Sequence, residues 1–332
     1  MELPVIGITM GDPAGVGPEI IVKALADPEL FKVCTPLILG DSGVISKTAN
    51  NLGVDIRIQV TEGIKDEKYQ VGFIHILNLS HIDMNTLVPG RSDERYGKAV
   101  VDYISFGTRL ALNGQIAAIT TAPINKELMH KAGYTYAGHT ELFAELTNTK
   151  DFVMMLAGEK LKVALVTTHC RLKDVADLLD VQKIFSTINI TDHSLKKYFA
   201  IQKPRIAVAS LNPHGGEGGV FGDEEQRIIF PAVEKARNMG IDASGPLPSD
   251  TLFYFTAQGD YDAVVCMYHD QALIPLKLLS FQDAVNITLG LPIIRTSVDH
   301  GTAYDIAGTG NANAASLKNA VKLAASMARR KV

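Results

Sequence analysis

The chain has 332 residues, of which 46% are hydrophobic and 20% charged, with a formal net charge of −4. These values are typical of a globular protein and exclude a disordered chain, and the length predicts about two domains. Acidic and basic residues are interspersed, so we expect no dedicated nucleic-acid surface, which would need clustered Lys and Arg.

Short apolar runs alternate with longer amphipathic ones along the first part of the chain. The apolar runs predict strands over residues 4–9, 36–40, 73–78 and 116–120. A helix is predicted from Pro18, since proline and the acidic Glu19 are both favourable in a first turn. A second helix is predicted over 97–113, where Asn113-Gly114 is a suitable end.

The second part of the chain repeats this rhythm. Strands are predicted over 152–156, 162–168, 205–211 and 263–269, and helices over 181–199, 224–240 and 315–330. The first two of these strands are close enough for a hairpin across Gly158-Glu159. Strands that alternate with helices predict an α/β fold with a mostly parallel sheet.

The cysteines and the N-terminus indicate the compartment. Cys34, Cys170 and Cys266 are far apart and include no CxxC pair, which favours a reducing compartment and excludes a thiolate zinc site. The first residues lack a secretory signal pattern, and no apolar run reaches the roughly 18 residues of a membrane span. We therefore expect a cytoplasmic protein with no membrane partner.

A glycine-rich turn, MGDPAGVGP (10–18), directly follows the first predicted strand. Its glycines would let backbone N–H groups approach an anion, but they would equally suit a tight turn that needs positive φ. The spacing alone leaves both interpretations open. It is neither the GxGxxG dinucleotide fingerprint nor a P-loop.

Three histidines follow predicted strands at their carboxyl ends, where open α/β sheets bind ligands: His169, His214 and His269. Three imidazoles with open coordination positions would bind a divalent metal such as zinc, which polarises a carbonyl oxygen. A single histidine is more often a satisfied or solvent-facing side chain. The residues alone leave a metal site and this simpler interpretation open.

Two other polar groups are candidates for binding an anion. His139 and Thr140 stand where a helix is predicted to begin, which would either seat a phosphate or be plain N-capping. Asn286 and Arg295 lie in apolar, strand-like segments, and a buried Arg needs an internal acid or an anionic ligand. We favour the ligand, because the guanidinium fork suits carboxylate and phosphate. Lys277 taken alone is more simply a solvated helix residue.

The long connection from Asp299 to Asn313 is rich in small residues and precedes the last predicted helix. Small side chains would let its backbone approach a flat ligand such as adenine. The segment could also be an irregular connection, although loops of this length are often functional.

Several segments together resemble the 4-hydroxythreonine-4-phosphate dehydrogenase family. They are GDPAGVGPEI, TAPINK, GHTELFAELT, TTH, LNPHGGEGG, YHDQ and VNITLGLPIIRTSVDHGTA, in that order from Met10 to about Gly310. Their joint agreement over nearly the whole chain is far more specific than any single motif. HGTAYDIAGTGNAN is separately similar to the adenosine-binding loop of isocitrate and isopropylmalate dehydrogenases, which share a fold with this family.

The resemblance implies two α/β/α domains around a cleft, isocitrate/isopropylmalate dehydrogenase-like and not Rossmann. We expect residues 1–127 plus 298–332 to form the first domain, with the cofactor loop, and 128–297 the second. The resemblance also implies a homodimer with a metal site shared between subunits. Its ligands fall on His169, His214 and His269, the third from the other subunit.

The resemblance further assigns roles to individual residues. Substrate contacts fall on His139, Thr140, Lys277, Asn286 and Arg295. Cofactor contacts fall within the long loop, on His300, Gly301, Thr302, Ala303 and Asn313. The candidates for the catalytic base are Asp250, Asp270 and a metal-bound water.

Family members oxidise a secondary hydroxyl with NAD or NADP, and the 3-keto acid that results loses carbon dioxide. We expect the same here, with zinc, cobalt, magnesium or manganese and a small phosphorylated substrate. That substrate is 4-phosphooxy-threonine, which gives 3-amino-2-oxopropyl phosphate for pyridoxal phosphate biosynthesis. The alternative is D-threonate or D-erythronate 4-phosphate, which gives dihydroxyacetone phosphate and CO2 in sugar-acid catabolism. The segment DQALIPLKLLSFQDAVNIT resembles that sister group at least as well.

Other functions stay possible on the residues alone. A more distant relative oxidises an aromatic cis-dihydrodiol, and the intact His139-Thr140 pair speaks against that substrate. A phosphotransferase or acyltransferase is disfavoured, because no GxxxxGK[ST] follows the first strand. A non-catalytic metabolite-binding protein would show no turnover.

Overall fold

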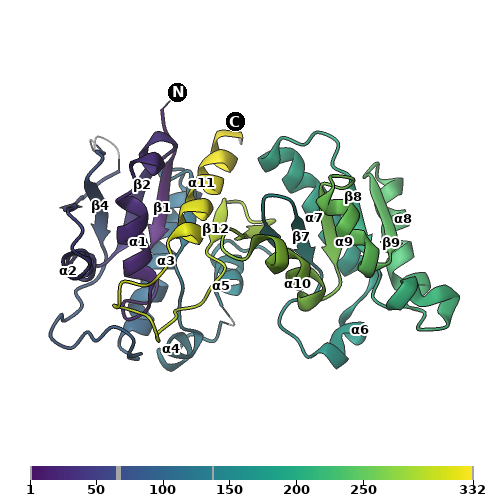
Figure 1. Ribbon diagram of the computed structural model, residues 1–332, viewed down its shortest axis with the longest axis horizontal. Coiled ribbons are helices and arrows are strands. Elements are labelled where there is room, and N and C mark those ends of the chain that lie inside the picture. Colours follow the sequence, from purple (N-terminus) through teal and green to yellow (C-terminus); the bar gives the residue numbers. More distant parts are fainter. Residues whose placement is uncertain (1, 65–68, 137, 331–332) are drawn as a thin grey trace. The chain divides into compact units, whose positions relative to one another are not determined.

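The computed structural model describes residues 2–64, 69–136 and 138–330, which divide into two compact units. The first unit comprises the chain up to Thr149 together with Leu291–Arg330, and the second comprises Lys150–Gly290. Each unit is a sheet covered by helices on both faces (Figure 1). The chain therefore leaves the first unit, builds the second and returns to complete the first.

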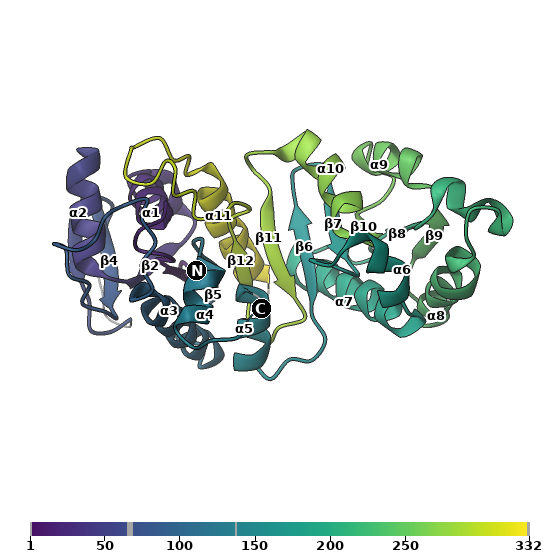
Figure 2. The same ribbon diagram turned by 90° about the horizontal axis from the view of Figure 1, so that it is seen from below.

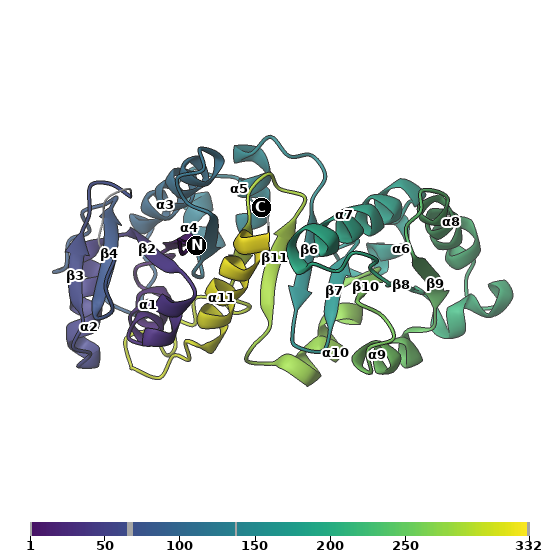
Figure 3. The same cartoon turned by 90° about the horizontal axis from the view of Figure 1, so that it is seen from above.

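The first unit is built on a parallel sheet in the order β3-β4-β2-β1-β5-β12. Its strands are β1 (Val5–Thr9), β2 (Thr35–Gly40), β3 (Arg57–Val60), β4 (Phe73–Asn78), β5 (Ala118–Thr121) and β12 (Arg295–Ser297). Its helices are α1 (Gly17–Leu25), η1 (Pro28–Lys32), α2 (Ser42–Leu52), α3 (Tyr96–Leu112), α4 (Lys126–Lys131), α5 (His139–Leu146) and α11 (Ala315–Arg330). Helices α1, α2 and α11 cover one face, and α3, α4 and α5 cover the other (Figures 2 and 3).

The second unit has a mixed sheet in the order β11-β6-β7-β10-β8-β9. Its strands are β6 (Val153–Ala157), β7 (Lys162–Leu165), β8 (Ile206–Ala209), β9 (Ala243–Leu247), β10 (Ala263–Cys266) and β11 (Val285–Leu289). Its helices are η2 (Leu172–Asp174), α6 (Val175–Leu178), α7 (Val181–Phe199), η3 (Pro213–Gly219), η4 (Glu225–Ile229), α8 (Phe230–Asn238), α9 (Ser249–Ala257) and α10 (His269–Ser280). Helices α9 and α10 lie on one face, and α7 and α8 on the other (Figure 3).

Apolar strands explain why both sheets are buried on both faces. Parallel strands covered by helices are near-continuous apolar runs, and β2 and β10 follow this pattern. In the first unit the core includes Leu37, Leu39, Ile104, Ile119, Met129 and Phe143. In the second unit it includes Leu156, Val163, Leu165, Val264, Leu252 and Leu276.

The predicted α/β class is confirmed, and so is the hairpin of the second unit. Strands β6 and β7 pair antiparallel, and the Gly158 N–H donates to the Leu161 carbonyl at 2.8 Å in the turn between them. Among the described residues, every helix is too short or too polar to pass through a lipid bilayer.

Several elements differ from the predictions. Helices α2, α4, α9 and α10 have no counterpart among the predicted helices. Strand β3 is an exposed edge strand without an apolar face, and β9 (ASGPL) contains a glycine and a proline, so neither has a strand-like pattern. The segment predicted as a strand over 263–269 ends at Cys266, and His269 instead begins α10. The Gln271 side chain accepts a hydrogen bond from the Met267 N–H at 2.7 Å, which fixes this strand-to-helix turn.

The unit boundaries fall elsewhere than the expected 127/128 and 297/298. Residues 128–149 belong to the first unit because α4 and α5 pack on α3 and bury Met129 and Phe143 in its core. Residues 291–297 belong to it because β12 pairs with β5. The expected boundaries followed motif positions, whereas the observed ones follow packing.

The glycine-rich turn between β1 and α1 is a tight turn at its first glycine. Gly11 has φ +71°, and a Cβ added there would lie 2.3 Å from the Pro123 carbonyl oxygen. Asp12, which is fully buried, accepts a hydrogen bond from the Ala14 N–H at 2.9 Å. At Gly11 the structure therefore supports the tight-turn interpretation, because only glycine fits both the conformation and the space.

We expect Gly11→Ala to destabilise the protein far more than Gly53→Ala. Gly53 also has a positive φ (+64°), but a Cβ there would meet nothing within 4 Å. Gly53→Ala should therefore lower the free energy of unfolding by about 1–2 kcal/mol, because alanine is strained in the left-handed conformation. Gly11→Ala should lower it by at least about 3 kcal/mol, because the added methyl group also clashes with the Pro123 carbonyl. Chemical denaturation of both variants measures the difference, and equal losses would contradict the close contact at Gly11.

Candidate active site

Several of the predicted substrate residues lie together in the first unit, where Arg295 of β12 contacts Phe143 of α5. Arg295, the first residue of β12, is only 2% exposed, and its Nη2 donates to the Thr121 hydroxyl at 2.8 Å. Its guanidinium lies 5.6 Å from the centroid of the Phe143 ring. The His139 ring stacks on Phe143 with centroids 6.5 Å apart. Phe143 therefore brings the predicted residues His139 and Arg295 together.

The start of α5 adds further groups to this site. Thr140 is buried, and the N-cap position is Gly138. The Lys126 side chain reaches this point, since a Cβ added at Gly138 would lie 3.6 Å from its Nζ. Within the described residues no side chain caps α5, and its first turn carries the acidic Glu141. An uncapped helix N-terminus favours a bound anion.

Burial and mutual repulsion set the protonation of this site. Burial lowers the pKa of Arg295 to about 9, an effect that Glu141 partly offsets. Burial, with the positive charges of Arg295 and Lys126, holds the pKa of His139 well below 6.5. The Nε2 of His139 is buried and has no hydrogen-bond partner among the described residues. A neutral imidazole whose Nε2 has no partner among the described residues thus lies near the Arg295 guanidinium.

Two of the predicted histidines lie close together in the second unit. Strands β7 and β10 pair in parallel as far as Leu165 and Cys266, and the Thr167 hydroxyl donates to the Met267 carbonyl at 2.6 Å. Two residues beyond, the rings of His169 and His269 have centroids 5.6 Å apart. The predicted convergence at strand ends thus occurs for this pair.

The third histidine, His214, lies in the loop after the neighbouring strand β8. It has a left-handed backbone (φ 52°), as do Gly215, Gly216, Glu217 and Gly218. The buried carboxylate of Glu225 holds this loop, because it accepts hydrogen bonds from the Leu211 and Asn212 N–H groups at 2.8 and 2.7 Å. His214 is therefore presented by a loop of unusual but well-anchored conformation.

An open pocket of about 400 Å³ connects His214 with a predicted catalytic candidate. It is lined by Leu211, Asn212, Pro213, His214, Ser249, Asp250, Tyr268 and Gln271. Gln271 fixes one wall, since its Nε2 donates to the Ser210 carbonyl at 2.6 Å and to the Ser249 hydroxyl at 2.9 Å. Asp270, the other candidate, lies 3.6 Å from His269 Nδ1 but its side chain is 73% exposed.

The described part of a single chain contains no group of three His, Cys, Asp or Glu side chains close enough to hold a metal ion. Of the three predicted ligands, the structure brings His169 and His269 together, and His214 lines a pocket that follows β8, the next strand in the sheet order β7-β10-β8. Neutral imidazole nitrogens are suitable metal ligands.

The remaining predicted substrate residues lie in the second unit. The Lys277 ammonium on α10 lies 5.3 Å from the centroid of the Phe281 ring. The Asn286 side chain on β11 has a buried Oδ1 with no hydrogen-bond partner among the described residues. A buried amide oxygen without a partner is costly, which is typical of a position that a ligand completes.

The predicted cofactor loop connects β12 to α11 in the first unit. His300 is exposed and its Nδ1 lies 3.0 Å from the Gly301 carbonyl oxygen, while the Thr302 carbonyl accepts from the Val16 N–H at 3.0 Å. Ala303 has a left-handed backbone (φ 41°). Asn313 caps the next helix, since its Oδ1 accepts from the Ala315 N–H at 2.9 Å. The loop is thus a folded structure rather than a loose connection.

Sequence reasoning missed Lys126, Glu225 and Gln271. Lys126 lies in TAPINK, one of the segments that carry the family resemblance. It is far from Arg295 in the sequence, so spacing alone does not show that the two residues belong to one site. Glu225 looks like an ordinary first-turn acid of a helix. Only its near-complete burial reveals that it supports the loop of His214.

An α/β fold with polar side chains gathered after the carboxyl ends of its strands is typical of an enzyme. The family model described as pyridoxal phosphate biosynthetic protein PdxA matches residues 32–324. A 4-hydroxythreonine-4-phosphate dehydrogenase from Desulforapulum autotrophicum is 54% identical over 97% of this chain and 95% of the relative. A D-threonate 4-phosphate dehydrogenase from Salmonella typhimurium is 46% identical over 99% of this chain and 100% of the relative.

A solved structure agrees with these relatives. The crystal structure of 4-hydroxythreonine-4-phosphate dehydrogenase from Klebsiella pneumoniae superimposes with a TM-score of 0.92 at 44% identity, covering 98% of each chain. The chain belongs to the PdxA family, and the resemblance found from its motifs is confirmed. The names of the relatives support an oxidoreductase.

The protonation of His139 predicts a dependence of stability on pH. Unfolding returns its pKa to about 6.5, so the unfolded chain binds one more proton than the folded protein below that pH. Stability should fall as the pH drops below about 6.5, with this residue contributing up to about 1.4 kcal/mol per pH unit. In His139→Gln, denaturation between about pH 6.5 and pH 5 should show a slope smaller by this amount.

A matched control is His193→Gln on α7, where the side chain is exposed. It should leave the slope of stability against pH unchanged. A His139→Gln variant with the wild-type slope would show that His139 is protonated in the folded protein.

Proposed function

We propose that the protein is an NAD(P)-dependent, divalent-metal-dependent dehydrogenase that oxidises the secondary hydroxyl of a 4-phosphorylated hydroxy acid. The 3-keto product then loses carbon dioxide. The substrate that we favour is 4-phosphooxy-threonine, which gives 3-amino-2-oxopropyl phosphate for pyridoxal phosphate biosynthesis. The alternative is D-threonate or D-erythronate 4-phosphate, which gives dihydroxyacetone phosphate.

The observation that carries this proposal is the cationic group at the start of α5. Arg295 is a buried cation, Lys126 reaches the same helix start, and His139 offers a buried nitrogen without a partner. A phosphate group would accept hydrogen bonds from these donors and from the first N–H groups of α5. Phosphate binding would also raise the pKa of His139 and allow it to donate, because it adds negative charge beside the ring.

The donors of the second unit fit a divalent metal if a second subunit contributes. His169, His214 and His269 each follow one of the neighbouring strands β7, β8 and β10 of the second unit, and imidazole nitrogens bind zinc at about 2.0–2.1 Å. The described residues of one chain do not complete a three-ligand site. We therefore propose a homodimer in which His169 and His214 of one subunit and the third histidine of its partner hold the ion.

Exposed apolar residues on α10 support this dimer. Ile274, Leu278 and Phe281 are 67%, 84% and 75% exposed, and Tyr254 on neighbouring α9 is 65% exposed. Ile274, Leu278 and Phe281 are spaced by four and three positions, so they share one face of the helix, and exposed apolar side chains gathered on one face mark a candidate interaction site. Because His269 begins α10, an interface formed by this helix would place its imidazole beside the partner subunit.

When bound, the nicotinamide accepts the hydride and the metal polarises the hydroxyl oxygen. Arg295, His139 and Thr140 would hold the phosphate, and Lys277 and Asn286 would orient the carboxylate end. A base must take the hydroxyl proton as the hydride leaves, and loss of CO2 then breaks the C–C bond and leaves an enolate that is reprotonated. Asp250 is better placed than Asp270 for this proton, because it lines the pocket of His214.

The cofactor would contact the loop that holds His300, Gly301, Thr302, Ala303 and Asn313. The structure of this loop supports that role, since it is ordered by backbone hydrogen bonds and is rich in small side chains. Between the substrates, the higher identity to the hydroxythreonine enzyme (54% against 46%) favours 4-phosphooxy-threonine. The two substrates differ at an amine and a hydroxyl, a distinction that one or two pocket residues could make.

Absorbance of the reduced cofactor tests this function directly. Purified protein is incubated with NAD or NADP and with 4-phosphooxy-threonine, D-threonate 4-phosphate or D-erythronate 4-phosphate, with and without a chelator. We expect reduction with one of them, loss of at least about 100-fold of the rate on chelation, and recovery when metal is restored. No reduction with any substrate would overturn the proposed function, and reduction that survives chelation would overturn the metal.

A further inference from the structure

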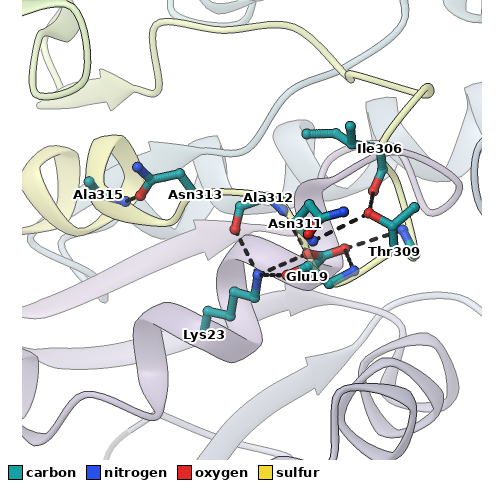
Figure 4. A network of polar contacts seen from close by, with 10 residues as sticks. Glu19, Lys23, Ile306, Thr309, Asn311, Ala312, Asn313 and Ala315 are labelled. Atoms are coloured by element: carbon teal, nitrogen blue, oxygen red, sulfur yellow. Dashed lines mark hydrogen bonds and ion pairs between the residues drawn. The ribbon is translucent and has the colours of Figure 1, made fainter.

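The first helix carries a pair of charged residues that the proposed chemistry does not use. Glu19 and Lys23 lie one turn apart on α1, joined by an ion pair of 3.0 Å, and Glu19 is only 2% exposed. Both side chains point at the turn 308–312 of the long loop, almost 300 residues further along the chain (Figure 4). The pair therefore differs from an ordinary ion pair on a helix surface, because its carboxylate is buried and binds a loop that is distant in the sequence.

The turn 308–312 forms a concavity of backbone N–H groups around this carboxylate. Glu19 accepts hydrogen bonds from the N–H groups of Gly308, Gly310 and Ala312 at 3.2, 3.4 and 2.9 Å. Gly308 and Gly310 have positive φ (77° and 80°), which turns successive N–H groups to one side. Such a nest binds anions, and here the anion is the protein's own carboxylate.

Lys23 carries the opposite charge to Glu19 and binds the carbonyl groups of the same turn. Its ammonium donates to the carbonyl oxygens of Gly310 and Ala312 at 2.6 and 2.8 Å, besides its ion pair with Glu19. The pair therefore satisfies both N–H groups and carbonyl groups of the same short turn. Hydrogen bonds to charged groups are the stronger ones, so the turn is held in one conformation.

The other end of the loop is tied to the glycine-rich turn that precedes α1. The Tyr304 hydroxyl donates to the buried Asp12 carboxylate at 2.5 Å and accepts from the Asn125 amide at 2.9 Å. The Val16 N–H donates to the Thr302 carbonyl at 3.0 Å. The segment from Asp12 to Lys23 is thus a scaffold for the whole loop.

We propose that Glu19 and Lys23 are positioning residues that hold the turn 308–312 in the conformation that binds the nicotinamide cofactor. This inference rests on the proposed function of the loop. Because Glu19 already fills the nest, the turn would repel the cofactor's phosphates and would contact its neutral adenosine portion. A small pocket beside Gly308 is lined by the apolar Leu52, Leu87 and Pro89 and by the polar Lys47, Thr48 and Asn51.

The physical consequence is a selective effect on cofactor affinity. A turn that is already ordered loses little conformational entropy on binding, whereas a loosened turn must be ordered by the cofactor itself. The phosphate seat at His139 and Arg295 does not include this turn. Loss of Glu19 or Lys23 should therefore weaken cofactor binding and leave the Michaelis constant for the phosphorylated substrate nearly unchanged.

The test compares Lys23→Met and Glu19→Gln with a matched control, Lys196→Met. Lys196 forms the same type of one-turn pair with the buried Asp192 on α7, at 2.7 Å, but lies in the other unit. Titration calorimetry measures the Kd for NAD and NADP, steady-state kinetics measures each Michaelis constant, and amide hydrogen exchange reports on Gly308, Gly310 and Ala312. Lys23→Met keeps the buried carboxylate, so it remains informative if Glu19→Gln fails to fold.

We expect Lys23→Met to raise the cofactor Kd by about tenfold and to speed exchange at these amides by a similar factor. The Michaelis constant for the phosphorylated substrate should change by less than about twofold, and Lys196→Met should change neither property. Unchanged cofactor affinity in a folded Lys23→Met variant would overturn the inference alone. A wild-type protein that binds neither NAD nor NADP would overturn the proposed function, and this inference with it.

Discussion

Parallel strand pairing is the constraint on which the candidate site depends. Strands that run the same way end at the same edge of a sheet, so residues that follow neighbouring strands are brought together however far apart they are in the chain. In the second unit this places His169 beside His269, which are separated by 100 positions, through the pairing of β7 with β10. In the first unit, the pairing of β5 with β12 sets Arg295 against Thr121. Both groups exist only because these strands pair in this register.

The burial of Arg295 lowers the stability of the folded protein, and its neighbours offset only part of that cost. A guanidinium that is 2% exposed loses most of its hydration, and burial lowers its pKa accordingly. The Thr121 hydroxyl and the Phe143 ring offset part of this cost, and a bound anion would offset more. His139 responds to the same field with a lowered pKa, so the phosphate group proposed for this site would gain both charge pairing and hydrogen bonds. The same logic applies to Glu19, whose carboxylate is stabilised by the nest that it organises.

The sequence predicted features with strong local signals: the strands with apolar runs, the longest helices α3, α7 and α11, and the hairpin at Gly158. It did not predict the shorter helices α2, α4, α9 and α10. It did not predict β3 or β9, because an exposed edge strand and a strand with Gly and Pro have no such pattern. Arg295 was recognisable from its charge within an apolar run, and the histidines from their positions after strands. Glu225 and Lys126 were not, because their roles depend on contacts across the fold that leave no trace in spacing. The unit boundaries could not be predicted without knowing how the helices pack. Helices α4 and α5 pack on α3 of the first unit, although the motif positions suggested that they belong to the second.

The most direct test of the proposed shared metal site is complementation between two variants that are each expected to be inactive. His214→Asn removes one imidazole while asparagine tolerates the left-handed backbone there, and His269→Asn removes the histidine proposed to come from the partner. The two chains are co-expressed with different affinity tags, and the mixed dimer is purified over both. If each site is shared between subunits, the mixed dimer has one intact site and one that lacks two histidines. The mixed dimer should then recover about half of the wild-type activity and bind one metal ion. A purified mixed dimer as inactive as its parents would contradict a metal held between subunits.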